Sequence, residues 1–118
     1  MMFDKRTKNA IGYGWKITTR RLFNPNRRPA IPGHKHKIKI DRTPTVYGEI
    51  YIIDCYPQKF GRMKEVDAHL EGFDSLKEYK EYFYKKNGYI DDDEIVWVID
   101  FRLIWGTSKG VILWNLKN

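Results

Sequence analysis

The sequence predicts an α+β domain, a small mixed β-barrel with two or three short helices packed outside it. Apolar residues follow β-type spacing in both outer parts of the chain and change to helical spacing only between about residues 63 and 87. The expected order is three strands, two helices and two strands, which lacks the regular alternation of a doubly wound sheet. The 118 residues, 42% hydrophobic and 15% aromatic, suffice for one domain with a core, so we treat 1–118 as a single domain.

The first third of the chain predicts two strands joined by a basic loop. Residues 1–14 form a basic N-terminal segment, which we expect to be a short helix or coil. Residues 16–22 are rich in β-branched and long side chains and stop at an Asn-Pro-Asn turn, as a strand does. Residues 27–33 contain two prolines and end in Pro-Gly, which predicts a loop. Residues 36–40 alternate polar and apolar side chains, which predicts a half-buried strand.

The middle of the chain predicts one strand and two helices. Residues 45–56 carry β-branched and aromatic side chains, and Pro57 is expected to end this strand. Residues 63–71 have the spacing of a short helix closed by Gly72. A Ser-x-x-Glu capping box at Ser75 opens a second helix, which ends at Asn87-Gly88.

The last part of the chain predicts the central strand and one more. Residues 91–94 form an acidic turn, and residues 95–104 are the most apolar strand. Residues 106–110 resemble a hairpin loop leading into a strand at 111–114, so 105–118 is a C-terminal extension with an extra strand. The expected core contains Ile50, Ile52, Leu76, Phe83, Trp97, Ile99, Phe101 and Leu103.

The charge of the chain is unevenly distributed. The formal net charge is +7, but residues 1–42 hold 12 Lys and Arg against two Asp, a balance of +10. Residues 43–118 hold 10 basic and 13 acidic groups, a balance of −3. A basic segment on a neutral body is typical of proteins that approach phosphates, although a merely basic surface gives the same count. We therefore expect RNA or a nucleoside as partner.

Several protein classes are disfavoured. The longest apolar stretch, Ile95–Ile99, is far below the roughly 20 residues that cross a bilayer, and the N-terminus has no apolar signal region. The single cysteine, Cys55, cannot form an internal disulfide, which favours a reducing cytoplasmic location. The three histidines and Cys55 lack the spacing of a zinc site, and the acidic turn lacks the glycine of a calcium loop. We expect neither a metal nor another cofactor, and the sequence sets no oligomeric state.

Three stretches taken together resemble the ASCH domain, a member of the PUA-like β-barrel superfamily. They are residues 14–21, the Pro32-Gly33 turn before a basic strand, and residues 68–76 leading to 96–101. Their order and spacing carry the resemblance, which covers about residues 12–104. The resemblance implies a PUA-like barrel and RNA binding or RNA-linked chemistry in its cleft. The most similar members are small ASCH proteins of the N4-acetylcytidine amidohydrolase type, while other members have been linked to RNA cleavage.

The resemblance also assigns candidate catalytic residues. In the amidohydrolase branch a Lys-x-x-Thr pattern lies on the first strand and a Glu precedes the long helix. Lys16, Thr19 and Glu71 match these positions, and Arg21 matches an arginine two residues after the threonine. The chain differs from the pattern in having Arg20 in place of an apolar residue, a more basic loop at 24–32, and the 105–118 extension.

The three candidates have the right chemistry for amide hydrolysis, which needs a nucleophile, a base and an acid. Lys16 can act as a base only if desolvation or neighbouring cations lower its pKa. Glu71 is expected at a helix C-terminus, where the macrodipole favours the protonated carboxyl of a general acid. A regular strand would place Lys16 and Thr19 on opposite faces, so their convergence requires a backbone irregularity between them. Taken singly, each residue also fits an ordinary structural position.

Three hypotheses follow. The first is an amidohydrolase that deacylates N4-acetylcytidine or a related modified base. The second is a non-catalytic RNA-binding module, and the third is a ribonuclease that uses Lys16 with a neighbouring hydroxyl. The residues expected to contact nucleic acid are Trp15, Arg20, Arg21, Arg27, Arg28, Lys35, Lys37 and Lys39.

Overall fold

The computed structural model describes residues 1–41, 43–108 and 111–114. The N-terminal half contains β1 (Met2–Phe3), α1 (Lys5–Gly12), β2 (Thr18–Leu22), β3 (Lys35–Ile40) and β4 (Val46–Lys59). A short 3-10 turn, η1 (Phe60–Arg62), leads into the remaining elements, which are α2 (Glu65–Leu70), α3 (Leu76–Asn87), β5 (Ile95–Ser108) and β6 (Val111–Trp114).

The strands form one mixed sheet, which confirms the predicted α+β class. Its order is β1-β3-β4-β5-β2, with β6 paired to β5. The β1–β3 pair is parallel, whereas β3–β4, β4–β5, β2–β5 and β5–β6 are antiparallel. The path is open rather than a closed barrel, because β1 and β2 stand at its two ends. Among the described strands, β2 therefore has a neighbour on one side only.

Apolar residues form two cores, one on each face of β5. Val96 and Val98 pack with Phe60 and Phe83 beneath α2 and α3. Ile99 and Phe101 pack in the other core with residues from α1, β1, β3 and β4. Burial on both faces explains why the segment is almost continuously apolar. Of the expected core, Ile50, Ile52, Phe83, Ile99 and Phe101 are buried, while Leu76, Trp97 and Leu103 are partly buried and pack against the two clusters.

Several predicted boundaries are wrong. The strand expected to stop before Pro57 runs to Lys59, because β3 pairs with β4 only as far as Tyr51 and the remainder of β4 has β5 as its single partner strand. A proline is tolerated where one side of a strand is unpaired. Helix α2 begins at Glu65 rather than residue 63, and β2 begins at Thr18 rather than residue 16. Strand β1 was not predicted, because two residues are too few to form a pattern.

The structure describes part of the predicted C-terminal loop and extension. Strand β5 continues to Ser108, beyond the predicted end at 104, and pairs with β6. Of the predicted 106–110 loop, residues 109 and 110 lie outside the described residues, as do residues 115–118 of the C-terminal extension.

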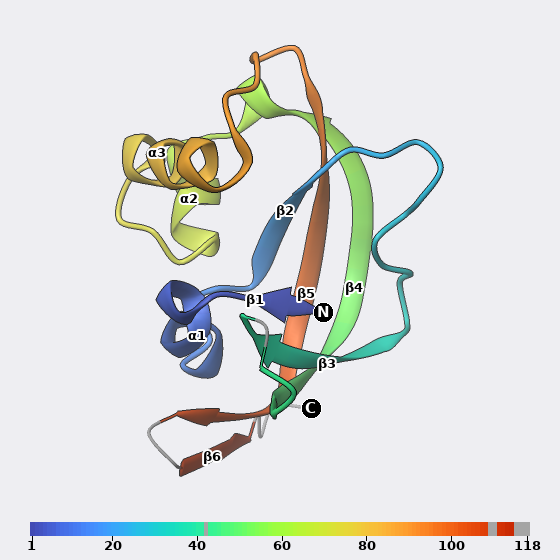
Figure 1. The fold of residues 1–118 in the computed structure, drawn as a ribbon, viewed down its shortest axis with the longest axis vertical. Coiled ribbons are helices and arrows are strands. Elements are labelled where there is room, and N and C mark those ends of the chain that lie inside the picture. Colours follow the sequence, from blue (N-terminus) through green and yellow to red (C-terminus); the bar gives the residue numbers. More distant parts are fainter. Residues whose placement is uncertain (42, 109–110, 115–118) are drawn as a thin grey trace.

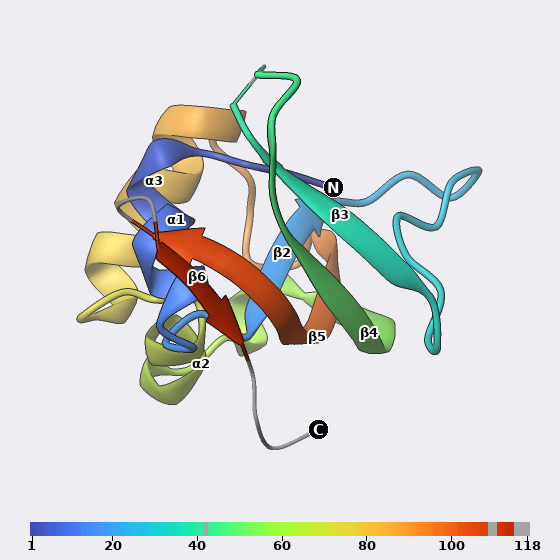
Figure 2. The same cartoon turned by 90° about the horizontal axis from the view of Figure 1, so that it is seen from below.

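The helices and the basic loop lie on opposite sides of the sheet. Figures 1 and 2 show α1, α2 and α3 together on one side, while the connection between β2 and β3 extends from the other. Within the described ranges, we find no helix that combines the length and the apolar character needed to span a bilayer. This arrangement separates the space beneath the helices from the basic 27–33 loop.

Candidate active site

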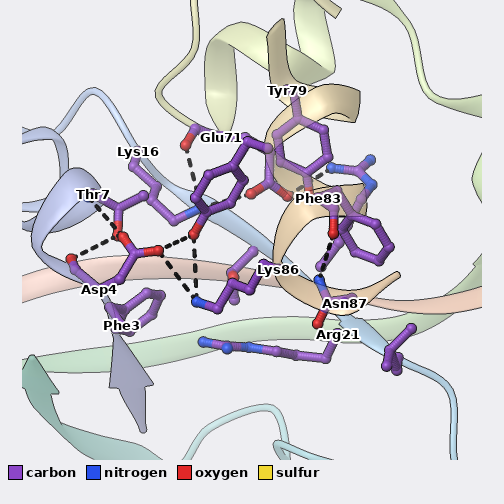
Figure 3. A pocket seen from close by; sticks show the side chains of 14 residues that line it. Phe3, Asp4, Thr7, Lys16, Arg21, Glu71, Tyr79, Phe83, Lys86 and Asn87 are labelled. Carbon is purple, nitrogen blue, oxygen red and sulfur yellow. Dashed lines mark hydrogen bonds and ion pairs between the residues drawn. The ribbon is translucent and has the colours of Figure 1, made fainter. Parts of the chain in front are cut away.

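A cavity of about 130 Å³ lies along the unpaired edge of β2, where β1, α1 and α3 meet it (Figure 3). Lys16, Thr19 and Glu71 line this cavity, together with Arg20 and Arg21. The structure therefore brings the three candidate catalytic residues into one space. Residues from β1 and α3 complete the wall, and these elements are distant from β2 in the sequence.

Lys16 reaches the cavity because the chain turns sharply between α1 and β2. Gly14 adopts a positive φ of 78°, and the amides of Trp15 and Lys16 both donate to the carbonyl of Ala10, at 2.8 and 3.0 Å. The Ile17 amide donates to the carbonyl of Leu70 at 2.8 Å, so regular pairing with β5 starts only afterwards. Strand alternation consequently does not apply between Lys16 and Thr19, and the structure contains the irregularity that their convergence requires.

Glu71 is held against Lys16 by the end of α2. It is the C-cap residue of this helix, and its backbone forms an isolated antiparallel bridge with Lys16. Gly72 follows with a positive φ of 92°, and a Cβ atom there would lie 3.0 Å from Ala10 Cβ and 3.3 Å from Lys16 Cβ. A glycine is therefore needed for the backbone to turn while remaining this close to Lys16.

The Lys16 ammonium is fully engaged in a buried cluster. Its Nζ atom donates to Glu71 Oε1 at 2.6 Å, to the Thr18 carbonyl at 2.8 Å and to the Glu71 carbonyl at 3.2 Å. An ammonium has three protons, so these three acceptors use its whole capacity. Both side chains are almost completely buried, at 4% exposed for Lys16 and 1% for Glu71.

Arg20 binds the second oxygen of the same carboxylate. Its Nη1 atom donates to Glu71 Oε2 at 3.0 Å and its Nη2 atom to Gln58 Oε1 at 3.2 Å. The side chain is 2% exposed, and its buried Nε atom has no partner among the described residues. Arg20 therefore belongs to the buried cluster, which corrects its predicted place on an RNA-contacting surface. Arg20 thus supplies Glu71 with a second cation.

The electrostatic setting of the cluster differs from the one expected. Two cations, Lys16 and Arg20, contact the Glu71 carboxylate, whereas the sequence pointed only to the helix end as an influence on this side chain. For Lys16, burial lowers the pKa from its ordinary value, the Glu71 carboxylate opposes this effect, and the Arg21 and Arg20 charges add to it. The pKa of Lys16 is thus lowered, with burial as the largest cause.

This pKa shift predicts how stability depends on alkaline pH. Folded Lys16 loses its proton below the ordinary value of 10.5, so in that window the unfolded chain binds more protons and the free energy of unfolding rises with pH. Tyr79 acts in the opposite direction above 10.0, since burial raises its pKa. We expect the free energy of unfolding, measured with urea, to rise with pH below 10.0 in the natural protein and to lack this rise in Lys16→Met. Parallel pH profiles for the two proteins would contradict this assignment.

Two adjacent threonines differ in their access to the cavity. Thr19 and Thr18 are similarly buried, at 5% and 6% exposed, but only Thr19 lines the cavity. Their side chains point to opposite faces of β2, as neighbours in a strand do. The Thr18 hydroxyl is buried without a hydrogen-bond partner among the described residues. Of the two threonines, only Thr19 is therefore exposed to a molecule in the cavity.

Tyrosines from α3 and an aspartate from the N-terminal segment complete the cavity. Asp4 caps α1 through Thr7 and accepts a hydrogen bond from Lys86 Nζ at 3.3 Å (Figure 3). It also accepts a hydrogen bond from the Tyr82 hydroxyl. Burial acts to raise the Asp4 pKa, but the bond from Tyr82 and the Lys86 charge lower it overall. Burial raises the pKa of Tyr82 and of Tyr79, so both phenols remain protonated donors.

The sequence analysis did not identify Asp4, Tyr79 and Tyr82 as parts of the site. The helical spacing places Tyr79 on the apolar face of a helix, which it also serves, because it packs edge-on against Phe73. Asp4 precedes a helix in the manner of an N-cap, and this signal could have located the start of α1 but not the cavity. Asp4, Tyr79 and Tyr82 come together through the packing of α1 and α3, and a local sequence pattern carries no information about this packing.

The other residues expected to contact nucleic acid lie outside the cavity. Arg27, Arg28, Lys35, Lys37 and Lys39 are exposed on the β2–β3 loop and on β3. Arg28 also donates to the Cys55 carbonyl at 2.6 Å, which fixes the loop to β4. Trp15 is 67% exposed, and its ring centroid is 5.4 Å from that of Tyr13. Across the described part of the chain, no three histidine, cysteine or acidic side chains are grouped so that they could hold a metal ion.

Comparison with solved structures identifies the fold. A protein of Enterococcus faecalis V583 from the DUF984 family superposes with a TM-score of 0.64 and 14% identity, over 84% of this chain and 70% of that one. The ASCH domain of Lactobacillus crispatus JV V101 gives a TM-score of 0.63 and 14% identity, over 83% and 70% of the two chains. The chain has the ASCH fold. The fold that the sequence resemblance implied is therefore confirmed.

A third ASCH structure extends the match along the chain. The ASCH protein of Zymomonas mobilis superposes with a TM-score of 0.59 and 20% identity, over 99% of this chain and 72% of that one. No family model matches the sequence, and the search of curated proteins found no match. The likeness is thus one of ASCH architecture alone.

Proposed function

We propose that this protein belongs to the ASCH family and hydrolyses an exocyclic amide on a nucleobase, with N4-acetylcytidine or a related acylated cytosine nucleoside as substrate. The observation that carries the proposal is the buried Lys16–Glu71 pair beside Thr19 on the wall of one cavity. A cavity of about 150 Å³ is known to hold one benzene ring, so a space of about 130 Å³ is of the order of a single pyrimidine. The sugar would then lie outside it.

The geometry supports a proton-balanced mechanism. Because Lys16 Nζ and Glu71 Oε1 are 2.6 Å apart, a proton can pass from the ammonium to the carboxylate and leave a neutral amine beside a carboxylic acid. The amine accepts the Thr19 hydroxyl proton as Oγ attacks the acyl carbon. The carbon–nitrogen bond then breaks, and Glu71 protonates the departing amine. Loss of this proton restores the original Lys16–Glu71 ion pair. Water then hydrolyses the acyl-threonine ester, which regenerates the Thr19 hydroxyl and releases acetate and one proton.

The lowered pKa of Lys16 supports this division of roles, since it reduces the cost of the neutral amine. The Tyr79 phenol lines the same cavity and stays protonated, so it is available to donate a hydrogen bond to substrate. The direct test is incubation of the protein with N4-acetylcytidine, with acetate and cytidine measured as products. Absence of both products, in a protein shown to be folded, would overturn the proposal.

A second candidate function is RNA binding without turnover. It is favoured by the exposed cations Arg27, Arg28, Lys35, Lys37 and Lys39, which belong to the segment with a charge balance of +10. These side chains lie on elements away from the cavity, so the two functions can be separated by mutation. A ribonuclease activity, the third hypothesis, would appear in the same assays as cleaved RNA.

The RNA-binding candidate predicts a measurable salt dependence. The logarithm of the association constant for single-stranded RNA should fall by about 0.7 per bound phosphate for each unit of log salt concentration. Replacing Arg27 and Arg28 with alanine should reduce this slope by roughly 0.7 for each phosphate that the variant no longer binds. Lys85→Ala, which removes an exposed cation on α3, serves as control. An association constant that does not change with salt would contradict RNA binding by this surface. So would equal effects of the Arg27 and Arg28 replacement and of Lys85→Ala on the slope.

A further inference from the structure

An outer groove of about 480 Å³ adjoins the cavity and shares four of its lining residues, which are Phe3, Asp4, Arg21 and Lys86. Met2 and Asp41 complete the groove. Because the same side chains border both spaces, a ligand with its ring in the inner cavity would place its remaining part in this groove. The charged side chains of the groove therefore determine which substituents on the ring can be bound.

The surroundings of the Arg21 guanidinium suit the binding of an anion. It is partly buried, with one Nη2 bond to the Met2 carbonyl at 2.7 Å and its guanidinium 5.1 Å from the Phe3 ring centroid. In the described ranges no carboxylate lies within ion-pair distance of it, in contrast to its neighbour Arg20. The bond to Met2 occupies one donor of a planar fork whose geometry matches a phosphate. Glu71 and Asp4 act on Arg21 only from a distance. A partly desolvated cation that has no directly paired carboxylate gains from an anionic ligand.

The acidic residues of the groove further restrict the chemical class of ligand that fits it. Asp4 already accepts from Lys86 and from Tyr82, so it is compensated within the protein. Asp41 has no ion pair among the described residues and is free to accept from hydroxyl groups. A ribose phosphate supplies both kinds of partner, hydroxyls and an anion. A free nucleoside supplies the hydroxyls but not the anion.

We propose that the outer groove is a ribose-phosphate subsite in which Arg21 binds the phosphate, so that a ribonucleotide or an RNA terminus binds more tightly than a free nucleoside. The inference rests on the proposed function in so far as it places a nucleobase in the inner cavity. It assigns different tasks to two consecutive arginines. Arg20 holds Glu71, and Arg21 binds the ligand.

The test compares cytidine and cytidine 5′-monophosphate by titration calorimetry. We expect the monophosphate to bind roughly 10- to 100-fold more tightly, the range of one or two charge-assisted hydrogen bonds. Arg21→Gln should remove this preference and Arg21→Lys should retain part of it. Arg62→Gln, an exposed change of equal charge on η1, should leave the preference unchanged.

Three results would overturn the subsite. They are equal affinity for both ligands in the parent protein, no binding of the monophosphate, or an equal loss of both affinities in Arg21→Gln, which would indicate a structural role at Met2 and Phe3. Acetate release from free N4-acetylcytidine distinguishes this failure from failure of the proposed function. A preference for the monophosphate without acetate release would support the subsite and contradict the proposed amidohydrolase activity. Acetate release without this preference would support the activity and contradict the subsite.

Discussion

Thr19→Val is expected to lower the rate of acetate release from N4-acetylcytidine by roughly 10³-fold or more, the scale seen when a catalytic nucleophile is removed. Valine has nearly the shape of threonine, so the packing of β2 should persist while the attacking oxygen is lost. Product formation under single-turnover conditions measures the chemical step directly. Circular dichroism and urea unfolding would verify that the variant retains the fold.

Thr18→Val is the matched control for this experiment. The two threonines are adjacent and similarly buried, but Thr18 does not line the cavity and its hydroxyl lacks a partner in the described structure. Replacing a buried, unpaired hydroxyl with a methyl group should leave turnover unchanged and be neutral or stabilising. Full activity in both variants would remove Thr19 from the mechanism. Equal losses in both would assign the effect to the packing of β2.

Glu71→Gln is expected to lower the free energy of unfolding by about 3–5 kcal/mol, the usual cost of breaking a buried ion pair from one side. The change leaves Lys16 and Arg20 buried without their shared counter-charge. Small domains are stable by only about 5–15 kcal/mol, so much of the total would be lost. The midpoint of urea denaturation provides the measurement.

Glu78→Gln calibrates this effect at the surface. Glu78 pairs with Arg6, and both side chains are more than 40% exposed, so the expected cost is at most about 1 kcal/mol. The double variant Glu71→Gln, Lys16→Met should recover part of the loss, because it removes one of the two uncompensated cations. Similar costs at Glu71 and Glu78 would show that the buried cluster contributes little to stability.

The stability cost also limits what Glu71→Gln can reveal about catalysis. From sequence alone, this substitution is a conservative removal of a proton donor. In the structure it also removes the only carboxylate that contacts Lys16 within the described residues. A fall in turnover would therefore combine lost chemistry with lost folding. Thr19→Val avoids this difficulty because Thr19 makes no ion pair.

Elements with strong local signals were predictable from the sequence. The Ser75 hydroxyl accepts from the Glu78 amide and opens α3, as the capping spacing indicated. Residues 36–40 alternate in β3, with Ile38 and Ile40 buried. In these cases the pattern comes from neighbours a few residues apart, so each segment carries its own information.

What the tertiary structure decided depends on contacts between distant residues. Strand β4 passes Pro57 because its other side lacks a strand, and β1 exists because β3 offers an edge. Arg20 and Arg21 look equivalent in the sequence, yet one is paired with Glu71 and the other borders an open groove. Lys16 and Glu71 are 55 residues apart, and their contact depends on how α1, α2 and β2 pack. The resemblance to a known family could name the candidate residues, but the burial and the neighbours of each arise only when the chain folds, because burial and Coulomb energy depend on distance in space and not in sequence.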